Sequence, residues 1–339
     1  MVAASVRSSQ LFSLTKIIFG INIAVFAAMA LSGVSLMQPT TLQLIKWGAN
    51  WGPLSLGPQP WRMLTANYVH IGIIHIFFNM WCLWNLGKLA ERIFDRWSYL
   101  LVYTATGIGG SLASLWWHSL TPGAGASGAI FGLAGALIAV LYSGKLPVAK
   151  DALKPTLKSL LSFAGYNLFF GLSAGIDNAA HLGGLATGLA LGAVVARSIA
   201  APPEVRERMR NYAAAGMVVL LFLATGYLRQ KTGKTDATAS LQDPVVAINH
   251  GNFGQAIPGL KQAAERDPNS APARYLLGIA YVGAHQPDAA VASFQEALRL
   301  RPDYADAEAG LGLAYQAKGM QPEAEEAFRK AAEFKHNAQ

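Results

Sequence analysis

The chain has 339 residues, of which 53% are hydrophobic and only 14% are charged, and its mean hydropathy is +0.30. Soluble domains carry about 25% charged residues, so this composition excludes an ordinary soluble enzyme and indicates a polytopic membrane protein. The net charge is +8, but the basic residues concentrate in short loops between apolar stretches, which argues against nucleic acid as a partner. Cys82 is the only cysteine, so no intramolecular disulfide can form.

Long apolar stretches dominate the first 230 residues. Each is close to the roughly 20 residues that a helix needs to cross a bilayer, and helices are expected because lipid cannot satisfy open backbone groups. The first stretch is long and lacks a convincing cleavage site, so we interpret it as a retained span rather than a secretory signal. The sequence therefore predicts an all-α fold with seven spans, at residues 17–37, 71–87, 97–120, 126–144, 159–176, 178–196 and 212–228.

The loops between these stretches differ in charge. The alternate loops, which precede the second, fourth and sixth spans, contain little that is basic beyond Lys46 and Arg62. By the positive-inside rule, the N-terminus is expected in the cytoplasm, and the segment after the seventh span is expected outside the cell (inner) membrane or in the periplasm. The basic residues that follow the second, fourth and sixth spans are Lys88, Arg92, Arg96, Lys145, Lys150, Lys154, Lys158, Arg206, Arg208 and Arg210.

Two polar side chains inside apolar stretches are the main candidates for chemistry. Ser127 is the second residue of the fourth stretch, and His181 is the fourth residue of the sixth. Both stretches run from outside to inside, and at 1.5 Å per residue the two side chains differ in depth by about 3 Å. A polar group within hydrocarbon is costly unless it faces protein or a water-filled cavity, so both residues are functional candidates. His75 and Asn79, at i and i+4, enter the same layer on one helical face.

This layer contains the groups that peptide hydrolysis needs. A serine hydroxyl requires a base, and the neutral imidazole of His181 suits that role near pH 7. The Ser127 backbone N–H at a helix N-terminus, together with the side chains of His75 and Asn79, can stabilise the oxyanion of the tetrahedral intermediate. Gly125 and Gly128 let a substrate backbone approach the serine closely.

Five sequence elements in this order resemble the rhomboid intramembrane serine proteases. They lie within about residues 10–200, and each falls in or beside the appropriate apolar stretch. The elements are Trp61-Arg62, the H-x4-H-x3-N pattern of His70, His75 and Asn79, Glu91-Arg92, the G-x-S-G pattern of residues 125–128, and the H-x2-G-x3-G pattern that starts at His181.

The resemblance implies a six-helix rhomboid-like core and a Ser127/His181 dyad with no obligatory acidic third member. The seventh span is then one extra transmembrane helix, and we expect no cofactor. It also implies an oxyanion site with His75, Asn79 and the nearby His70. Substrates would be transmembrane proteins cut near the outer membrane face. Many bacterial members carry a tyrosine that packs on the catalytic histidine where this chain has Phe131. Phenylalanine keeps the aromatic face, and we group Phe131 with Gly125 and Gly128 as the path of substrate approach.

Simpler interpretations compete with these assignments. For Ser127 alone, helix packing would be favoured, and only the joint presence of His181, His75 and Asn79 reverses that preference. Packing also explains the glycines at 184, 188 and 192. Asp177 is a triad acid or a helix cap, and an apolar helical run after it favours the cap. A zinc protease fits worse because the chain has no H-E-x-x-H pattern. Metal binding by His70, His75 and His181 is a separate and weaker alternative, and we predict no metal.

The composition changes after residue 228. A polar linker leads into a segment with a 34-residue period that resembles tetratricopeptide repeats, in which pairs of helices bury small and aromatic residues against each other. We predict a protease core at 1–200, a cytoplasmic loop and seventh span at 201–230, a linker at 231–240 and a repeat domain at 241–339. The matching positions are Pro268 and Pro302, Gly278 and Gly312, Tyr281 and Tyr315, Ala290 and Ala324, Phe294 and Phe328, and Ala297 and Ala331.

The function that follows is an intramembrane serine endopeptidase in the lipid bilayer, with transmembrane protein substrates and a protein or peptide partner for the repeats. The alternative is an inactive rhomboid-like scaffold that binds transmembrane helices and assembles through its repeats. The presence of both Ser127 and His181 argues against the scaffold, because an inactive relative needs neither.

Overall fold

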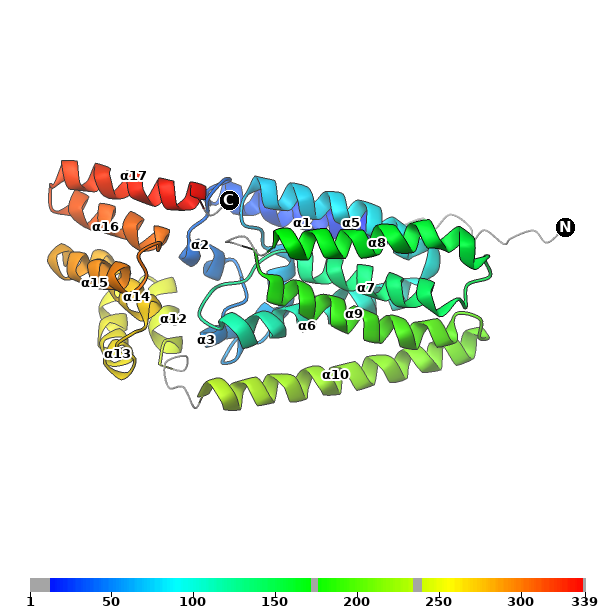
Figure 1. Ribbon diagram of the computed structural model, residues 1–339. Coiled ribbons are helices and arrows are strands. Elements are labelled where there is room, and N and C mark those ends of the chain that lie inside the picture. The colour runs from blue at the N-terminus through cyan, green and yellow to red at the C-terminus, as the bar shows by residue number, and fades with distance from the viewer. Residues whose placement is uncertain (1–12, 172–175, 234–239, 338–339) are drawn as a thin grey trace.

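The computed structural model describes residues 13–171, 176–233 and 240–337, and Figure 1 shows their arrangement. These residues are helical, apart from loops and one isolated bridge between Asn50 and Gly123. The predicted all-α fold is thereby confirmed. A bundle of long helices forms most of the molecule, and a set of shorter paired helices lies at one end of it.

The long helices occupy the predicted apolar region. They are α1 (Leu14–Leu31), α5 (Ile73–Ile93), α6 (Arg96–His118), α7 (Ser127–Ser143), α8 (Lys150–Phe170), α9 (Asn178–Ser198) and α10 (Pro203–Gly233). The connection from α1 to α5 holds four short helices: α2 (Thr41–Lys46), α3 (Gly52–Ser55), α4 (Arg62–Thr65) and the 3₁₀ helix η1 (Ala66–Tyr68).

Several helix ends differ from the sequence-based spans. The first span was predicted to reach residue 37, but α1 stops at Leu31, and Gly33 follows with a φ of +87° that ends the helix. The segment 201–211 was expected as a loop, but nearly all of it belongs to α10, which also includes residues 231–233 of the predicted linker. Residues 172–175 of the fifth span and 234–239 of the linker lie outside the described residues.

Membrane-crossing helices are present, though the described residues support fewer of them than predicted. By length and composition, α1, α9 and α10 are long and apolar enough to span a membrane. The segment of α4 and η1 is bent by 93° relative to α5. If these two parts form one broken span, they add a fourth. Helix α7 is apolar but has only 17 residues, and α8 begins with charged residues from Lys150 to Lys158. The chain is a multi-pass membrane protein, and the number of seven spans remains a prediction.

Helix α7 is the centre of the bundle and packs on α9 through glycines. A Cβ atom added to Gly188 would lie 2.1 Å from the Gly132 carbonyl oxygen, and one added to Gly184 would lie 2.0 Å from that of Gly128. Only glycine permits backbones to approach this closely. The predicted packing role of these glycines is confirmed.

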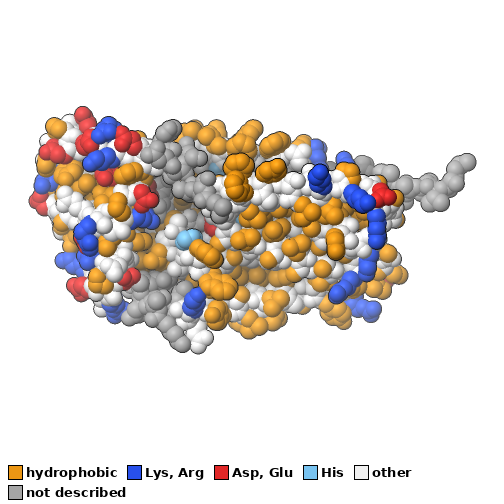
Figure 2. All heavy atoms as spheres, viewed as in Figure 1, with side chains coloured by type: hydrophobic (Ala, Val, Ile, Leu, Met, Phe, Trp, Pro, Cys, Tyr) orange, Lys and Arg blue, Asp and Glu red, His pale blue; other side chains and the backbone are white. Residues whose placement is uncertain are grey.

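The surface of the bundle is divided along its length. Figure 2 shows hydrophobic side chains over the middle of the bundle, with Lys and Arg gathered at the end away from the short paired helices. Large apolar residues are exposed on the outer helices, including Phe77, Trp81, Tyr166 and Phe222. Such a band is expected of a surface that faces lipid.

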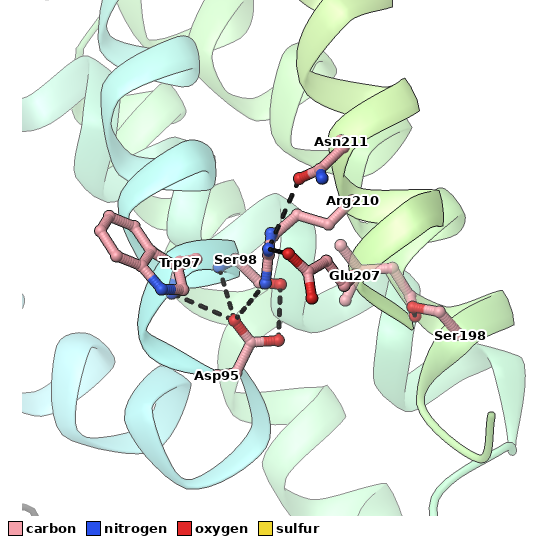
Figure 3. Close-up of polar contacts among 8 residues, drawn as sticks. Asp95, Trp97, Ser98, Ser198, Glu207, Arg210 and Asn211 are labelled. Atoms are coloured by element: carbon pink, nitrogen blue, oxygen red, sulfur yellow. Dashed lines mark hydrogen bonds and ion pairs between the residues drawn. The ribbon is translucent and has the colours of Figure 1, made fainter. Parts of the chain in front are cut away.

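Asp95 joins α10 to the rest of the bundle (Figure 3). Its carboxylate accepts hydrogen bonds from the backbone N–H groups of Trp97 at 3.1 Å and Ser98 at 3.0 Å, and so caps α6. The same carboxylate lies 3.5 Å from the Arg210 guanidinium of α10, and both side chains are mostly buried. Asp95 therefore combines a helix cap with an ion pair between helices.

We expect Asp95→Ala to destabilise the folded protein by about 1–2 kcal/mol, since a lost N-cap alone costs about 1 kcal/mol. Burial raises the pKa of Asp95, but hydrogen bonds from Ser98 and the charge of Arg210 outweigh it, so the pKa lies below its ordinary value. The stabilisation is therefore complete at neutral pH and is lost as the pH falls through that lowered pKa. Thermal unfolding in detergent at several pH values measures both effects.

Asp151→Ala, which removes an exposed ion pair with Lys154, serves as the control. An equal loss of stability in that variant would contradict the structural role assigned to Asp95.

The paired helices at the end of the bundle are the predicted repeats. Helices α14 and α16 start 34 residues apart, as do α15 and α17. A Cβ atom on Gly278 would lie 2.6 Å from the Phe294 ring, and one on Gly312 would lie 2.6 Å from the Phe328 ring, which explains why glycine and phenylalanine recur together. The helices are α12 (Gln242–Asn249), α13 (Phe253–Arg266), α14 (Ala271–Gly283), α15 (Pro287–Leu300), α16 (Ala305–Ala317) and α17 (Gln321–Asn337).

The repeats are docked on the loop between α1 and α5. Ile45 of α2 and Leu54 of α3 are fully buried in the same apolar cluster as Leu241 and other repeat residues. In addition, the Asp306 carboxylate of α16 accepts a hydrogen bond of 2.9 Å from the Thr41 backbone N–H at the start of α2. The repeat domain is therefore packed against the membrane bundle (Figure 1).

Candidate active site

The helix N-termini of α5, α7 and α9 meet at the end of the bundle nearest the repeats. Ser127 is the first residue of α7, and His181 lies in the first turn of α9. The two backbones touch at Gly128 and Gly184, one residue after Ser127 and three after His181. This contact brings the predicted nucleophile and the predicted base into one layer.

The His181 imidazole lies flat on Phe131. The ring centroids are 4.2 Å apart with an interplanar angle of 10°, and Phe131 is only 3% exposed. A side chain buried under the imidazole supports that ring and does not line an open path. Phe131 therefore does not lie on the path of substrate approach, where the sequence analysis put it. His181 Nδ1 is buried without a hydrogen-bond partner among the described residues. Stacking on Phe131 is therefore the contact that holds the orientation of the imidazole ring.

His75 lies against the turn that precedes Ser127. Gly125 has a φ of +132°, and a Cβ atom there would lie 2.6 Å from His75 Cε1, so only glycine fits this position. The backbone N–H of Ile71 donates to His75 Nδ1 at 3.4 Å. A neutral imidazole that accepts at Nδ1 carries its proton on Nε2, so His75 has a donor available beside Gly125.

His70 has a different role from the predicted one. It is fully buried, and its Nε2 accepts a hydrogen bond of 3.4 Å from the Ala126 backbone N–H. Its Nδ1 lies 3.4 Å from the Tyr68 carbonyl oxygen, to which it donates. With both nitrogens in use, His70 has no donor left for an oxyanion, and it holds the 125–126 backbone in place instead.

Asn79 lies one turn after His75 in α5. Its Nδ2 donates to the His75 carbonyl oxygen at 2.9 Å, and its Oδ1 is buried with no partner in the described part of the chain. The second Nδ2 hydrogen is not used by that bond, because a primary amide has two donors. Asn79 therefore can still donate one more hydrogen bond through Nδ2.

Asp177 caps α9, as the sequence indicated. Its Oδ1 accepts a hydrogen bond of 2.9 Å from the Ala180 backbone N–H, two residues beyond the start of the helix. The same residue lines a small polar cavity of about 30 Å³ beside Ser127. Such a cavity has room for a water molecule, which needs at least about 10–15 Å³.

Other residues of this cavity were not singled out in the sequence. Gly125 and Gly128 line it, and so do four polar residues of the loop and of α6: Asn50, Asn67, Ser111 and Ser114. These four side chains are buried. Isolated Asn and Ser in apolar sequence have no pattern that separates a cavity lining from ordinary packing.

No metal cluster is evident in the parts of the chain that the structure describes, since no three His, Cys, Asp or Glu side chains there are grouped to hold an ion. The prediction of a metal-free site remains a prediction.

The remaining sequence elements stabilise the scaffold. The buried Arg62 guanidinium donates to the carbonyl oxygens of Ile45 and Ala49, and so fixes the segment after α2. The Glu91 carboxylate accepts hydrogen bonds from the Ser13 hydroxyl at 2.8 Å and the Thr15 backbone N–H at 3.1 Å, at the start of α1. Both residues act on the scaffold and lie away from the serine.

Comparison with known proteins agrees with this architecture. The model of the rhomboid domain matches residues 57–198, and two tetratricopeptide repeat models match residues 247–292 and 275–338. The chain is 31% identical over 210 residues to rhomboid protease AarA of Providencia stuartii. The aligned region covers 54% of this chain and 74% of that protein. The chain belongs to the rhomboid family and carries C-terminal tetratricopeptide repeats.

Other relatives match different shares of the chain. Rhomboid protease GluP of Bacillus subtilis (strain 168) is 30% identical over 307 residues, which cover 90% of this chain and 58% of that protein. RHOMBOID-like protein 6, mitochondrial, of Arabidopsis thaliana is 35% identical over 184 residues, which cover 53% of this chain and 57% of that protein. The chain thus spans about half the length of the first curated relatives that it matches.

Proposed function

We propose that this protein is an intramembrane serine endopeptidase in which Ser127 is the nucleophile and His181 the general base. The observation that carries the proposal is the close contact of α7 and α9 at Gly128 and Gly184, which sets both residues at one depth. Relatives that are named rhomboid proteases add support. We further propose that its substrates are transmembrane helices cut near the outer membrane face.

The proposed reaction follows from the groups in the layer. His181 takes the proton from Ser127 Oγ as the oxygen attacks the substrate carbonyl, and then gives that proton to the leaving amine. The oxyanion receives hydrogen bonds from the Ser127 backbone N–H at the positive end of α7, from His75 Nε2 and from Asn79 Nδ2. Water from the adjacent polar cavity then hydrolyses the acyl-enzyme, with His181 again as the base.

Active-site labelling separates this function from that of an inactive scaffold. We expect a serine-reactive fluorophosphonate to modify Ser127 in the full-length protein in detergent, because a phosphonate serine adduct forms only at an activated hydroxyl. Peptide mass spectrometry identifies the labelled residue. His181→Ala should prevent labelling, and Ser143→Ala at the other end of α7 should not change it. A full-length protein that binds transmembrane helices but takes no label would be the scaffold.

We propose that the repeat domain binds soluble protein segments at the mouth of the same site. Docking through Asp306 and the buried Leu241 cluster sets the repeats at the end of the bundle where Ser127 lies. In that position a repeat surface can hold the soluble part of a membrane substrate while its transmembrane helix enters the catalytic layer.

The same arrangement makes a prediction about topology. Residues 241–339 should lie outside the cytoplasmic membrane, because basic side chains gather at the opposite end of the bundle, which is expected in the cytoplasm (Figure 2). Fusions at the C-terminus test this: we expect strong alkaline phosphatase activity and weak green fluorescence. A fluorescent and phosphatase-inactive C-terminus would reverse the assigned orientation. Fusions after Leu146, in the basic loop, supply the opposite pattern as the control.

A further inference from the structure

A second cavity lies at the end of the bundle opposite to Ser127. It is an open groove of about 470 Å³ between the last turns of α7 and α9. Tyr142 follows Ser127 by 15 residues and Arg197 follows His181 by 16, so the rim of the groove is about 22–24 Å from the catalytic layer along the helices, and the floor at Leu189 is about 12 Å from it. The rim therefore lies near the other surface of the bilayer.

The floor of the groove is apolar and small side chains keep it open. Ile138 of α7 and Leu189 and Ala193 of α9 line it, and Leu189 and Ala193 are exposed. A surface of this kind is suited to hydrocarbon, and a larger residue at Ala193 would fill part of the space.

The mouth of the groove is positively charged. Lys145 follows α7, and Arg197 belongs to the last turn of α9. Both side chains are exposed, and no acidic residue lines the groove. Tyr142, which is 83% exposed, completes the rim. Two cations beside an apolar floor are complementary to an amphiphile with an anionic head.

We propose that this groove binds one anionic phospholipid of the leaflet opposite to Ser127. Its phosphate lies between Lys145 and Arg197, and one acyl chain runs along Ile138, Leu189 and Ala193. A phospholipid fits better than a free phosphate ion because only a lipid uses the apolar floor. The position also agrees, since Figure 2 shows Lys and Arg side chains gathered at this end of the bundle, at the level where lipid headgroups lie. The proposal does not depend on catalysis.

Native mass spectrometry of the full-length protein, released from micelles doped equally with phosphatidylglycerol and phosphatidylcholine, tests the proposal. We expect the wild type to retain one phosphatidylglycerol in preference to phosphatidylcholine. Lys145→Gln combined with Arg197→Gln should lower that retention by about 10-fold or more. Ala193→Phe should lower it similarly without any change of charge, because the acyl chain loses its space.

A matched variant separates a specific groove from general attraction to basic loops. Lys154→Gln combined with Lys158→Gln removes the same charge from α8 at the same end of the bundle, outside the groove lining. We expect this variant to retain the lipid as the wild type does, with unchanged thermal unfolding in all variants. Equal loss in both double variants, full retention in Ala193→Phe, or equal retention of the two lipids by the wild type would each overturn the proposal.

Discussion

Ser127→Ala should abolish cleavage of a model transmembrane substrate in liposomes while the protein remains folded. Removal of a nucleophile from a serine peptidase lowers turnover by roughly 10⁴-fold or more. Ser127 is half-buried at the first position of α7, where its loss leaves no large cavity. Gel-based cleavage assays with purified protein measure the effect, and thermal unfolding verifies the fold.

His181→Ala should be about as damaging, because the hydroxyl then loses the imidazole proposed as its base, and His75 already accepts a hydrogen bond at its unprotonated nitrogen. Asn79→Ala should be milder, with a loss of about 10²–10³-fold in kcat, since the Ser127 backbone N–H and His75 remain as donors. Ser143→Ala, in the last turn of the same helix, is the matched control and should cleave normally. Turnover at the wild-type level in the Ser127→Ala protein would end the protease assignment.

Gly188→Val should unfold the membrane bundle. The added Cβ would meet the Gly132 carbonyl oxygen at 2.1 Å, so α7 and α9 must separate along the face that also aligns the catalytic layer. Overpacking of a close interface usually lowers the free energy of unfolding by up to about 3 kcal/mol. We expect a loss at this upper end, because the neighbour here is a backbone atom, which cannot move aside as a side chain does. Thermal unfolding in detergent and the fraction of protein that elutes as a single species measure the loss.

A valine at Gly216 of α10 is the control for this substitution, because an added Cβ there has no neighbour within 4 Å. We expect Gly216→Val to unfold at nearly the wild-type temperature. If Gly188→Val were equally stable and active, α7 and α9 would not pack as described, and the shared depth of Ser127 and His181 would lose its structural basis.

Much of the candidate site was predictable because its signals are local. The spacing of His75 and Asn79 and the positions of Ser127 and His181 within apolar stretches indicated one layer from helical rise alone. The cap at Asp177 followed from a residue type and the helix after it, and the structure confirms that cap. The number of spans does not follow from hydropathy in the same way, because hydropathy alone does not separate a lipid-facing helix from a central one such as α7.

The sequence by itself determined the helical class, the family motifs, the catalytic candidates and the 34-residue repeat, because each depends on residue type at short spacing. Tertiary structure decided the rest. The orientation of His70, with both nitrogens bonded, and the burial of Phe131 beneath His181 depend on which helices touch. So do the polar cavity beside Ser127 and the docking of the repeats through Asp306. Contacts between residues more than 200 positions apart, such as Asp306 with Thr41, leave no periodic trace in the chain, so only the packed molecule reveals them.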